Sequence, residues 1–446
     1  MKIAIVGSGI AGCSAAWHAS AFAEHVTVFE SMSRLGGHTH TQQVCVEGSS
    51  FPVDTGFIVF NHRTYPGLKA WLEMLKVETA ASDMSFSASL NDGQLEWCGT
   101  DLNAVFAQRR NLVSPRFWRM LADIVRFNRQ APVHAAEYRK LPGSGPSLGL
   151  YLDRQGYGRL FLDAYLLPMA GAIWSCPTEQ MRAFPMATFT RFCENHGLLS
   201  LTNRPQWYTI RHGAVSYIEA LQAKLSSLGR QVVWKTCHDV EQVLPEAPLA
   251  NDGVRISGLN RNGEPSPFSE RFDAVILACH SDQASRILPH GSEAKQLVSK
   301  IRYQDNTAFL HTDASLMPKR TSAWASWNYR HQRDHDNSRV SVTYWMNRLQ
   351  PLPVKTPVLV SLNPTQAPRP ETVINTMHYM HPIFDGPAVR AQAALPSVQG
   401  VHGIWLAGAW ARYGFHEDGY QSGVQAVESL KSVLETRYGQ AYPRAA

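Results

Sequence analysis

Three glycines near the N-terminus have the spacing of a phosphate-binding turn. Gly7, Gly9 and Gly12 follow an apolar run at residues 2–6 and precede an alanine-rich segment at residues 13–23. In a strand, turn and helix unit the first glycine permits the tight turn. The second lets the backbone approach a diphosphate, and the third lets the helix pack on the strand. A glycine turn with a purely structural role is the alternative, and the order of the elements favours a nucleotide site.

A carboxylate follows the next β-rich run, which spans residues 25–29 and leads into Glu30 and Ser31. An acid at this point of a dinucleotide fold accepts hydrogen bonds from the adenosine ribose, and it repels the 2'-phosphate of NADP. The diphosphate would lie on the N-terminus of the first helix, at the amides of Ile10 and Ala11. We therefore expect a dinucleotide other than NADP, with Glu30 and Ser31 beside its ribose.

The next segment, Ser33 to His38 with the sequence Ser-Arg-Leu-Gly-Gly-His, resembles the Arg-x-Gly-Gly element of the flavin-dependent amine oxidase and phytoene desaturase superfamily. The resemblance implies FAD as the cofactor, with the glycine pair close to its diphosphate. His38 and His40 would then be neighbours of the diphosphate. The cofactor-binding residues that this resemblance implies here are Arg34, Gly36, Gly37, His38, Thr55, Gly56 and Val240.

A second glycine-rich element lies near the C-terminus. A predicted strand ends at Gly408, and Glu417, Asp418 and Gly419 open the last helix. This pair resembles the second flavin fingerprint of the superfamily, in which the helix N-terminus stabilises negative charge on the reduced flavin. The superfamily usually has an acid directly after the strand glycine, and this sequence has Ala409. Glu417 or Asp418 could replace that acid as the partner of a ribityl hydroxyl.

A closer resemblance extends over most of the chain. The strings that carry it include residues 54–61, 95–100, 324–329, 343–347 and 413–419. They resemble bacterial FAD-dependent oxidoreductases associated with cyclopropane fatty acid synthases, and the N-terminal flavoprotein part of plant cyclopropane synthases. This resemblance implies an oxidoreductase that desaturates unsaturated or methyl-branched acyl chains of membrane phospholipids beside a cyclopropane-synthase-like methylase. A fatty-acid double-bond isomerase, a non-catalytic flavoprotein partner of the methylase and an amine oxidase are the alternatives.

Removing hydrogen from an acyl chain also requires a nearby proton acceptor. The candidate catalytic residues are His416, Tyr413, Tyr344 and His311. For each of them an ordinary structural hydrogen bond is the competing interpretation. An amine oxidase would instead need an aromatic cage, which Trp174, Trp207, Tyr344 and Trp410 could form, although aromatic residues also suit a lipid tunnel.

The fold class expected from these patterns is α/β. A Rossmann-like FAD-binding domain of the glutathione reductase type would be interleaved with an α+β substrate domain. The chain of 446 residues is long enough for two domains. We assign residues 1–75, 213–290 and 400–446 to the FAD-binding domain, and residues 76–212 and 291–399 to the substrate or lipid-binding domain.

Composition excludes several classes of function. The net charge of +6 is mildly basic, and no nucleic-acid-binding module accompanies it. The seven cysteines are odd in number and contain no C-x-x-C pair, which indicates reduced thiols and no metal site. The first strand follows Met1 directly and leaves no room for a signal peptide, so a cytoplasmic location is expected.

The region from Arg109 to Arg129 alternates arginines with large apolar residues. Such a basic amphipathic helix could lie on an anionic membrane, here the inner membrane face. The competing interpretation is a solvated arginine face over an ordinary hydrophobic core. A lipid substrate would favour the membrane.

Overall fold

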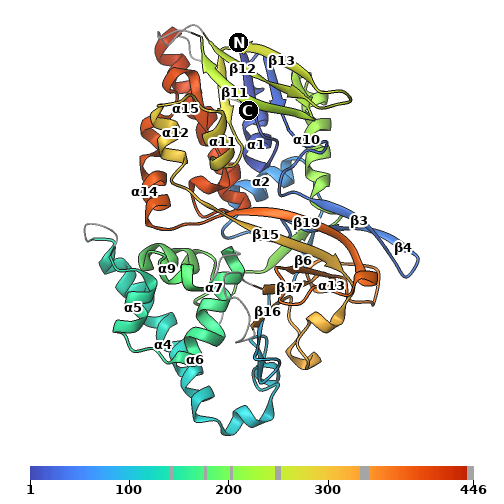
Figure 1. Cartoon of the computed structure of the whole chain (residues 1–446), viewed down its shortest axis with the longest axis vertical. Helices are drawn as coiled ribbons and strands as arrows, with labels where there is room; N and C mark the ends of the chain where they lie inside the picture. Colours follow the sequence, from blue (N-terminus) through green and yellow to red (C-terminus); the bar gives the residue numbers. More distant parts are fainter. Residues whose placement is uncertain (141–144, 175–177, 201–203, 247–252, 332–340, 439–446) are drawn as a thin grey trace.

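A five-stranded parallel sheet forms the centre of the upper domain (Figure 1). The computed structural model describes residues 1–140, 145–174, 178–200, 204–246, 253–331 and 341–438. The strands, in spatial order, are β10 (Val232–Lys235), β2 (His25–Phe29), β1 (Lys2–Val6), β14 (Ala274–Leu277) and β20 (Ile404–Leu406). They are almost continuously apolar, as strands covered on both faces must be. The predicted Rossmann-like α/β fold is confirmed.

Two helices that begin at the carboxyl edge of this sheet pack against each other. Helix α1 (Ile10–Ala19) follows β1, and helix α15 (His416–Tyr438) follows β20. A Cβ atom added to Gly419 would lie 2.6 Å from the side chain of Ile10, so only glycine allows this close approach. Because both strands are parallel, both helix N-termini lie at the same edge, where α/β folds bind nucleotides.

A three-stranded antiparallel sheet packs against the central parallel sheet. It consists of β11 (His238–Pro245), β12 (Val254–Asn260) and β13 (Ser266–Phe272). The ring of Phe29 stacks on that of Phe268 at 5.5 Å, which joins the two sheets. β10 ends at Lys235, and β11, which contains Val240, begins at His238.

The lower domain contains a seven-stranded sheet. At one edge, the hairpin β7–β8 turns at residues 91–93, where Asn91, Asp92 and Gly93 all have positive φ. β7 pairs in parallel with β16, although the two are far apart in the chain. The spatial order is β19 (Val373–Pro382), β15 (Tyr303–His311), β18 (Leu359–Leu362), β17 (Ser341–Trp345), β16 (Trp327–His331), β7 (Phe86–Leu90) and β8 (Leu95–Cys98).

Helices form the lowest part of the molecule, around a core rich in aromatic residues. Ser147 accepts a hydrogen bond from the Leu150 amide and starts α5, as predicted. The elements are α3 (Leu102–Val105), η1 (Arg109–Val113), α4 (Pro115–Tyr138), α5 (Leu148–Arg154), α6 (Arg159–Phe161), the π-helix η3 (Leu162–Leu166), α7 (Leu167–Trp174), α8 (Thr178–Arg182) and α9 (Met186–Asn195). No helix within the described ranges is long and apolar enough to cross a bilayer.

Smaller elements connect the two domains. A buried carboxylate, Asp54, accepts hydrogen bonds from the Ala214 amide at the start of α10 (Val215–Ser227) and from the Gln350 side chain. It therefore ties the two domains together. The connecting elements are β3 (Thr41–Val46), β4 (Ser49–Asp54), β5 (Phe60–Asn61), α2 (Pro66–Met74), β6 (Thr79–Ser82), β9 (Trp207–Ile210) and α13 (Met346–Leu349).

Three further helices lie against the nucleotide-binding sheet (Figure 1). They are α11 (Ser281–Ile287), α12 (Glu293–Val298) and α14 (Gly386–Ala394). Val298 and Ala388 are buried in the same hydrophobic cluster as Val275 of β14. The expected boundaries at residues 290 and 400 placed α12 and α14 in the substrate domain. Their packing places them with the nucleotide-binding sheet instead.

Candidate functional site

The glycine turn after β1 has the geometry that its spacing predicts. Gly7 has φ +102°, and a Cβ atom on Gly12 would lie 1.9 Å from the Gly7 carbonyl oxygen. At Gly9 an added Cβ would meet no atom within 4 Å. No side chain caps the α1 N-terminus, for which Gly9 is the N-cap. The open space therefore lies where a diphosphate would approach Gly9, Ile10 and Ala11.

The predicted ribose acid, Glu30, is held beside this turn. Its carboxylate accepts hydrogen bonds from the Ser8 amide at 3.0 Å and the Ser8 hydroxyl at 2.6 Å. The Ser8 hydroxyl also accepts the Gly36 amide at 3.0 Å. Ser31, whose hydroxyl lies 3.4 Å from the other carboxylate oxygen, is an immediate neighbour. Ser8 was not among the expected site residues, because its only signal in the sequence is a small polar residue between two glycines.

The Arg-x-Gly-Gly segment lies directly against the glycine turn. A Cβ atom added to Gly37 would be 3.3 Å from the Cα of Gly9. The guanidinium of Arg34 donates to the Gly37 carbonyl at 2.8 Å and so fixes the conformation of the loop. Gly36 has φ +107°, which favours glycine. The two glycine-rich elements that the sequence placed near one diphosphate are therefore adjacent.

Thr55 and Gly56 lie behind this loop. The Thr55 hydroxyl donates to the His40 carbonyl at 2.9 Å. A Cβ atom on Gly56 would come within 2.1 Å of the His38 carbonyl oxygen. Their packing shapes the loop that carries His38 and His40.

His38 lies in an aromatic cluster that the sequence analysis did not find. Its ring centre is 5.4 Å from that of His280, 5.3 Å from Tyr379 and 5.4 Å from His381. Burial, followed by the neighbouring cationic groups, lowers the pKa of His38 to about 3. Its Nε2 atom is buried without a protein partner, so it is available to a ligand. In the described part of the chain, no group of His, Cys, Asp and Glu side chains could hold a metal ion.

His416, the first residue of α15, belongs to a buried triangle of polar groups. Its Nε2 lies 3.1 Å from the Thr39 hydroxyl and 3.3 Å from the Tyr217 hydroxyl, which are themselves 2.6 Å apart. Its ring stacks on Phe57 at 3.6 Å. Burial lowers the pKa of His416 to about 3. The ring is therefore neutral at physiological pH and is a weak proton acceptor.

The acids at the start of α15 have structural partners. The carboxylate of Glu417 accepts the amides of Gly67 at 3.0 Å and Leu68 at 2.8 Å, at the N-terminus of α2. These bonds give Glu417 a structural role, and its contact with a ribityl hydroxyl stays a prediction. Asp418 is buried and accepts the Phe415 amide at 3.0 Å. Burial raises its pKa to about 7.

Gly408 and Gly419 bring α15 close to the first glycine turn. The Gly408 amide donates to Ser422 at 2.9 Å, and a Cβ atom on Gly408 would clash with the Trp410 ring. The side chain of Val240, by contrast, is buried in the core between the central sheet and β11–β13. Only the backbone of Val240 could therefore contact a cofactor, and its assignment as a cofactor-binding residue stays a prediction.

The remaining catalytic candidates do not converge on His416. Both ring nitrogens of His311 have partners, the Ser361 hydroxyl at 2.8 Å and the Asp313 amide at 3.0 Å, and the ring is fully buried. His311 therefore has a structural role, which corrects its assignment. Tyr344 packs edge-on against Trp327 in the seven-stranded sheet. Tyr413, three residues before His416, lies against Phe192 at 5.7 Å, and burial raises its pKa.

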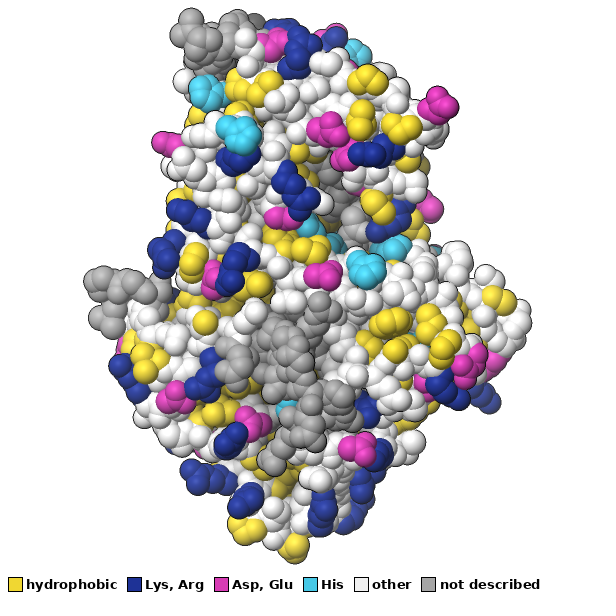
Figure 2. All heavy atoms as spheres, in the orientation of Figure 1, with side chains coloured by type: hydrophobic (Ala, Val, Ile, Leu, Met, Phe, Trp, Pro, Cys, Tyr) yellow, Lys and Arg dark blue, Asp and Glu magenta, His cyan; other side chains and the backbone are white. Residues whose placement is uncertain are grey.

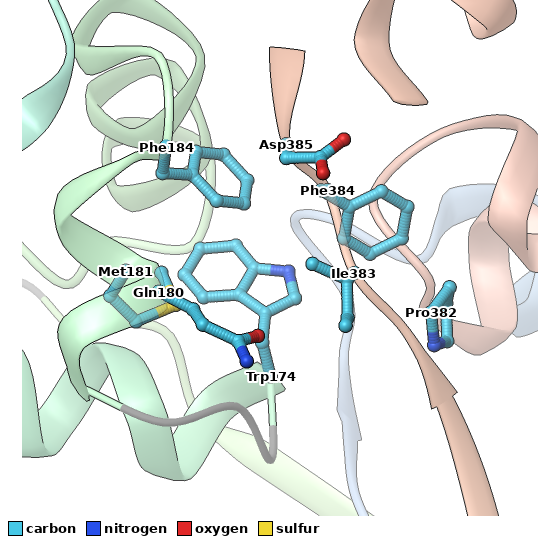
Figure 3. A pocket seen from close by; sticks show the side chains of 8 residues that line it. All are labelled: Trp174, Gln180, Met181, Phe184, Pro382, Ile383, Phe384 and Asp385. Carbon is cyan, nitrogen blue, oxygen red and sulfur yellow. The ribbon is translucent and has the colours of Figure 1, made fainter. Parts of the chain in front are cut away.

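A small pocket lies between the helices of the lower domain and the end of β19 (Figure 3). Of its two polar lining side chains, Asp385 is already bonded to Arg302 and to the Ala388 amide, and the other is Gln180. The indole of Trp174 donates to the Tyr413 carbonyl at 3.2 Å, which places the pocket beside the segment leading to His416. The lining residues are Trp174, Gln180, Met181, Phe184, Pro382, Ile383, Phe384 and Asp385.

The proposed amine cage is not assembled. Trp410 is buried in the core of the nucleotide-binding domain, where its indole donates to the Cys279 carbonyl. Trp174 packs in the helical core of the lower domain. Trp207 lies on β9, in the small sheet that β9 forms with β5 and β6. Trp410 is therefore apart from the other three, whereas Tyr344 packs against one hydrophobic cluster with Trp174 and against another with Trp207.

Comparisons with known proteins agree with this architecture. A family profile described as an NAD(P)-binding Rossmann-like domain matches residues 5–75. No curated protein matches the sequence. Among solved structures, the chain is similar to a fatty acid isomerase from P. acnes that produces CLA, with 13% identity, 98% coverage of both chains and a TM-score of 0.63.

Two amine oxidases have the same fold. A putrescine oxidase bound to putrescine is 14% identical over 97% of this chain and 99% of its own, with a TM-score of 0.65. A cyclohexylamine oxidase from Brevibacterium oxydans IH-35A is 16% identical over 96% of this chain and 99% of its own, with a TM-score of 0.61. The expected amine-oxidase-like fold is confirmed.

Proposed function

We propose that this protein is an FAD-dependent oxidoreductase. The observation that carries the proposal is the meeting of two glycine-rich helix starts, α1 and α15, with the Arg34 to His38 loop at one edge of the sheet. The open space at Gly9 and the unpartnered Nε2 of His38 fit the diphosphate of a bound dinucleotide. The fold of the amine oxidases supports FAD as that dinucleotide.

Each residue has a defined part in holding the cofactor. Glu30 would accept the adenosine ribose hydroxyls, and the α1 amides would bind the diphosphate. The α15 N-terminus would stabilise negative charge on the flavin. When bound, FAD supplies the capacity to accept two electrons from a substrate. His416, neutral and held by Thr39 and Tyr217, would donate or accept a hydrogen bond at a fixed point beside it.

The proposed substrate, an apolar acyl chain, comes from the sequence resemblance. The pocket beside Trp174 is lined mainly by apolar and aromatic side chains, and the carboxylate of Asp385 is already bonded. An amine substrate would require an acceptor for its charge, and both oxygens of the Asp385 carboxylate already accept bonds from Arg302 and the Ala388 amide. Unsaturated or methyl-branched acyl chains of phospholipids, which the sequence resemblance implies, are chemically compatible with this apolar lining. A cyclopropane-synthase-like methylase as partner rests on the sequence resemblance.

The proposed reaction is desaturation of the acyl chain. One C–H bond would break on each of two adjacent carbons, and a C=C bond would form between these carbons. Bound FAD would take up one hydrogen together with both electrons, and the other hydrogen would leave as a proton to solvent or a protein group. Double-bond isomerisation is the second candidate, favoured by the similarity to the fatty acid isomerase over nearly all of both chains. It returns the hydrogen to the same chain and leaves no net oxidation.

The test is anaerobic mixing of the FAD-loaded protein with phospholipids that carry methylated or unmethylated unsaturated chains. Bleaching of the visible flavin absorbance together with a loss of two hydrogens, detected by mass spectrometry, supports the desaturase. A shifted double bond at unchanged mass, without lasting bleaching, supports the isomerase. No change with any lipid would contradict both and favour a non-catalytic flavoprotein partner.

A matched pair of variants connects this test to the pocket. Met181→Asn places a polar group in the pocket, whereas Met181→Leu keeps it apolar with a similar volume. The first change should weaken reduction of the flavin by lipid, and the second should leave it nearly unchanged. Equal rates of flavin reduction in the two variants would show that the acyl chain does not bind in this pocket.

A further inference from the structure

Helix α4 has apolar residues on two opposite faces. Phe117, Ile124 and Phe127 are buried in the core of the lower domain. Trp118 and Val125, seven residues apart, lie on the other side of the helix and are exposed. The apolar stripe that an amphipathic helix would insert into a membrane is therefore used by the core. The exposed apolar residues need a separate explanation.

These residues continue into the two elements before α4. Leu102 of α3 is 78% exposed, Val113 at the end of η1 is 84% exposed and Trp118 is 50% exposed. The Trp118 indole donates to the Leu112 carbonyl at 2.8 Å, and its ring lies 5.3 Å from Phe106. The exposed apolar residues of this region are therefore held on a structured surface and do not project from a loose loop. Together, Leu102, Leu112, Val113 and Trp118 are referred to below as the α4 tip.

The position and charge of the α4 tip restrict what could bind it. It belongs to the lowest part of the molecule in Figure 1, and Figure 2 shows hydrophobic and basic side chains together at that end. Between residues 102 and 136 the only acidic residue is Asp123, which is buried and paired with Arg126. The same stretch exposes five arginines: Arg109, Arg110, Arg116, Arg119 and Arg129.

We propose that the α4 tip and these five arginines form a docking surface for a bilayer that contains anionic phospholipids. Exposed Leu, Val and Trp side chains gain by entering the interface between headgroups and acyl chains, and tryptophan is favoured at that depth. The arginines around them bind lipid phosphates. A protein partner would be expected to meet both charge signs at a polar rim, whereas here five exposed arginines outnumber Asp101 and Glu137, the exposed acids at the two ends of the stretch.

This inference is independent of the proposed redox function. It rests on the exposure and charge of α3, η1 and α4, and not on FAD or on the pocket beside Trp174. Binding to vesicles can be measured without turnover. Failure of vesicle binding would therefore leave the redox proposal intact, and failure of turnover would leave the docking surface intact.

The test is co-sedimentation of the FAD-loaded full chain with two kinds of vesicle, phosphatidylcholine alone and phosphatidylcholine mixed with phosphatidylglycerol. The protein should sediment with the mixed vesicles and much less with the neutral ones, and added salt should release it. Equal binding to both vesicles, or none to either, would overturn the proposal.

Two double variants separate the apolar and the basic parts of the surface. Leu102→Ser with Val113→Ser changes two highly exposed side chains, so the fold should be retained while vesicle binding falls. Arg116→Gln with Arg119→Gln should weaken binding to mixed vesicles on the order of twentyfold, because each arginine near an anionic surface contributes about fivefold in affinity. Thermal unfolding checks that each variant is folded.

A control pair removes exposed apolar residues elsewhere, with Leu228→Ser and Val401→Ser. These changes should leave vesicle binding at the wild-type level. If both pairs reduced binding equally, the α4 tip would have no specific role. If the wild-type chain proved to be a dimer that the Leu102 and Val113 changes dissociate, without vesicle binding, the surface would be a protein interface and the proposal would be wrong.

Discussion

The Nε2 atom of His416 lies 3.1 Å from the hydroxyl of Thr39, and this contact joins the two glycine-rich elements of the site. Thr39 follows the Gly36–Gly37 pair, and His416 is the first residue of α15. Tyr217 of α10 closes the triangle. Three segments that are distant in sequence are thus fixed relative to one another by one buried polar group. The orientation of His416 depends on this network.

His416 is expected to act as a hydrogen-bonding group and not as the base. Burial lowers its pKa to about 3, which makes it a poor proton acceptor near neutral pH. His416→Gln retains a side chain that can bond to Thr39, so anaerobic flavin reduction by substrate should keep about a tenth of its rate or more. His416→Phe should lose on the order of a hundredfold. Stopped-flow absorbance measures both rates.

The pH profile of the wild-type protein provides the control. Flavin reduction should show no rising limb centred near the ordinary histidine pKa of about 6.5. A limb at that pH that disappears in His416→Gln would show that His416 is the base after all.

Gly9→Ala and Gly12→Ala should separate cofactor binding from folding. The added methyl group at residue 9 meets no protein atom within 4 Å, and the backbone there has φ −62°, which suits alanine. The FAD-free protein should keep its Tm, while FAD affinity falls about tenfold or more because the methyl group occupies the approach to the diphosphate. Titration of the FAD-free protein with FAD measures this change.

At residue 12 the methyl group would lie 1.9 Å from the Gly7 carbonyl oxygen. Gly12→Ala should therefore destabilise the fold itself, by about 1 to 3 kcal/mol. A Gly9→Ala protein that binds FAD normally would show that the diphosphate does not approach this turn.

The parts of the site that the sequence predicted are those set by local spacing. The turn at Gly7 to Gly12 and the acid at Glu30 are defined by a strand, a helix and a strand in immediate succession. Tyr379 and His381 could not be found this way, because they reach His38 from β19, a strand of the other domain. Only the three-dimensional structure shows that these two residues lie beside His38.

The same reason explains why the structural partners of Glu417 were not predicted. Its position in the last helix resembles that of a cofactor ligand, but its partners are the amides of Gly67 and Leu68. These residues lie some 350 positions earlier in the chain. The α12 and α14 helices were likewise assigned by their place in the chain, whereas their apolar faces pack on the nucleotide-binding sheet.

Glu417→Ala should lower stability without loss of FAD. The carboxylate satisfies two amides at the N-terminus of α2, and loss of such a cap costs about 1 to 2 kcal/mol. Glu417→Gln retains an acceptor oxygen and should cost less. Denaturant unfolding measures the stability, and fluorescence titration measures FAD binding. If Glu417→Ala lost FAD at unchanged stability, Glu417 would be the ribityl acid that the sequence suggested.

Acidification should destabilise the FAD-free protein between about pH 6.5 and pH 4. Burial lowers the pKa values of His38, His381 and His416 to about 3, from the ordinary 6.5. Below pH 6.5 these histidines are therefore protonated in the unfolded chain but stay neutral in the folded chain. Their contribution to stability is present above pH 6.5 and is lost as the pH falls toward 3, at up to about 1.4 kcal/mol per pH unit for each ring.

Two buried carboxyls act in the opposite direction. Burial raises the pKa values of Asp54 and Asp418 to about 7, from the ordinary 3.8. The folded chain protonates these two carboxyls at a higher pH than the unfolded chain does. Their contribution to the free energy of unfolding is therefore present below pH 3.8 and is lost as the pH rises toward 7. Five further histidines have pKa values lowered to about 4 and act with the first three: His18, His40, His196, His280 and His311. The histidines outnumber the two acids, so acidification should lower the Tm.

A single variant tests whether burial lowers the pKa values of these histidines. His381→Asn removes one buried ring that titrates in this range and keeps a polar side chain beside Asn306. The pH dependence of its free energy of unfolding should therefore be shallower than that of the wild-type protein by close to one proton. Denaturant titrations at a series of pH values measure both slopes. An identical slope, or a wild-type Tm that rises on acidification, would mean that these histidines are not held neutral by burial.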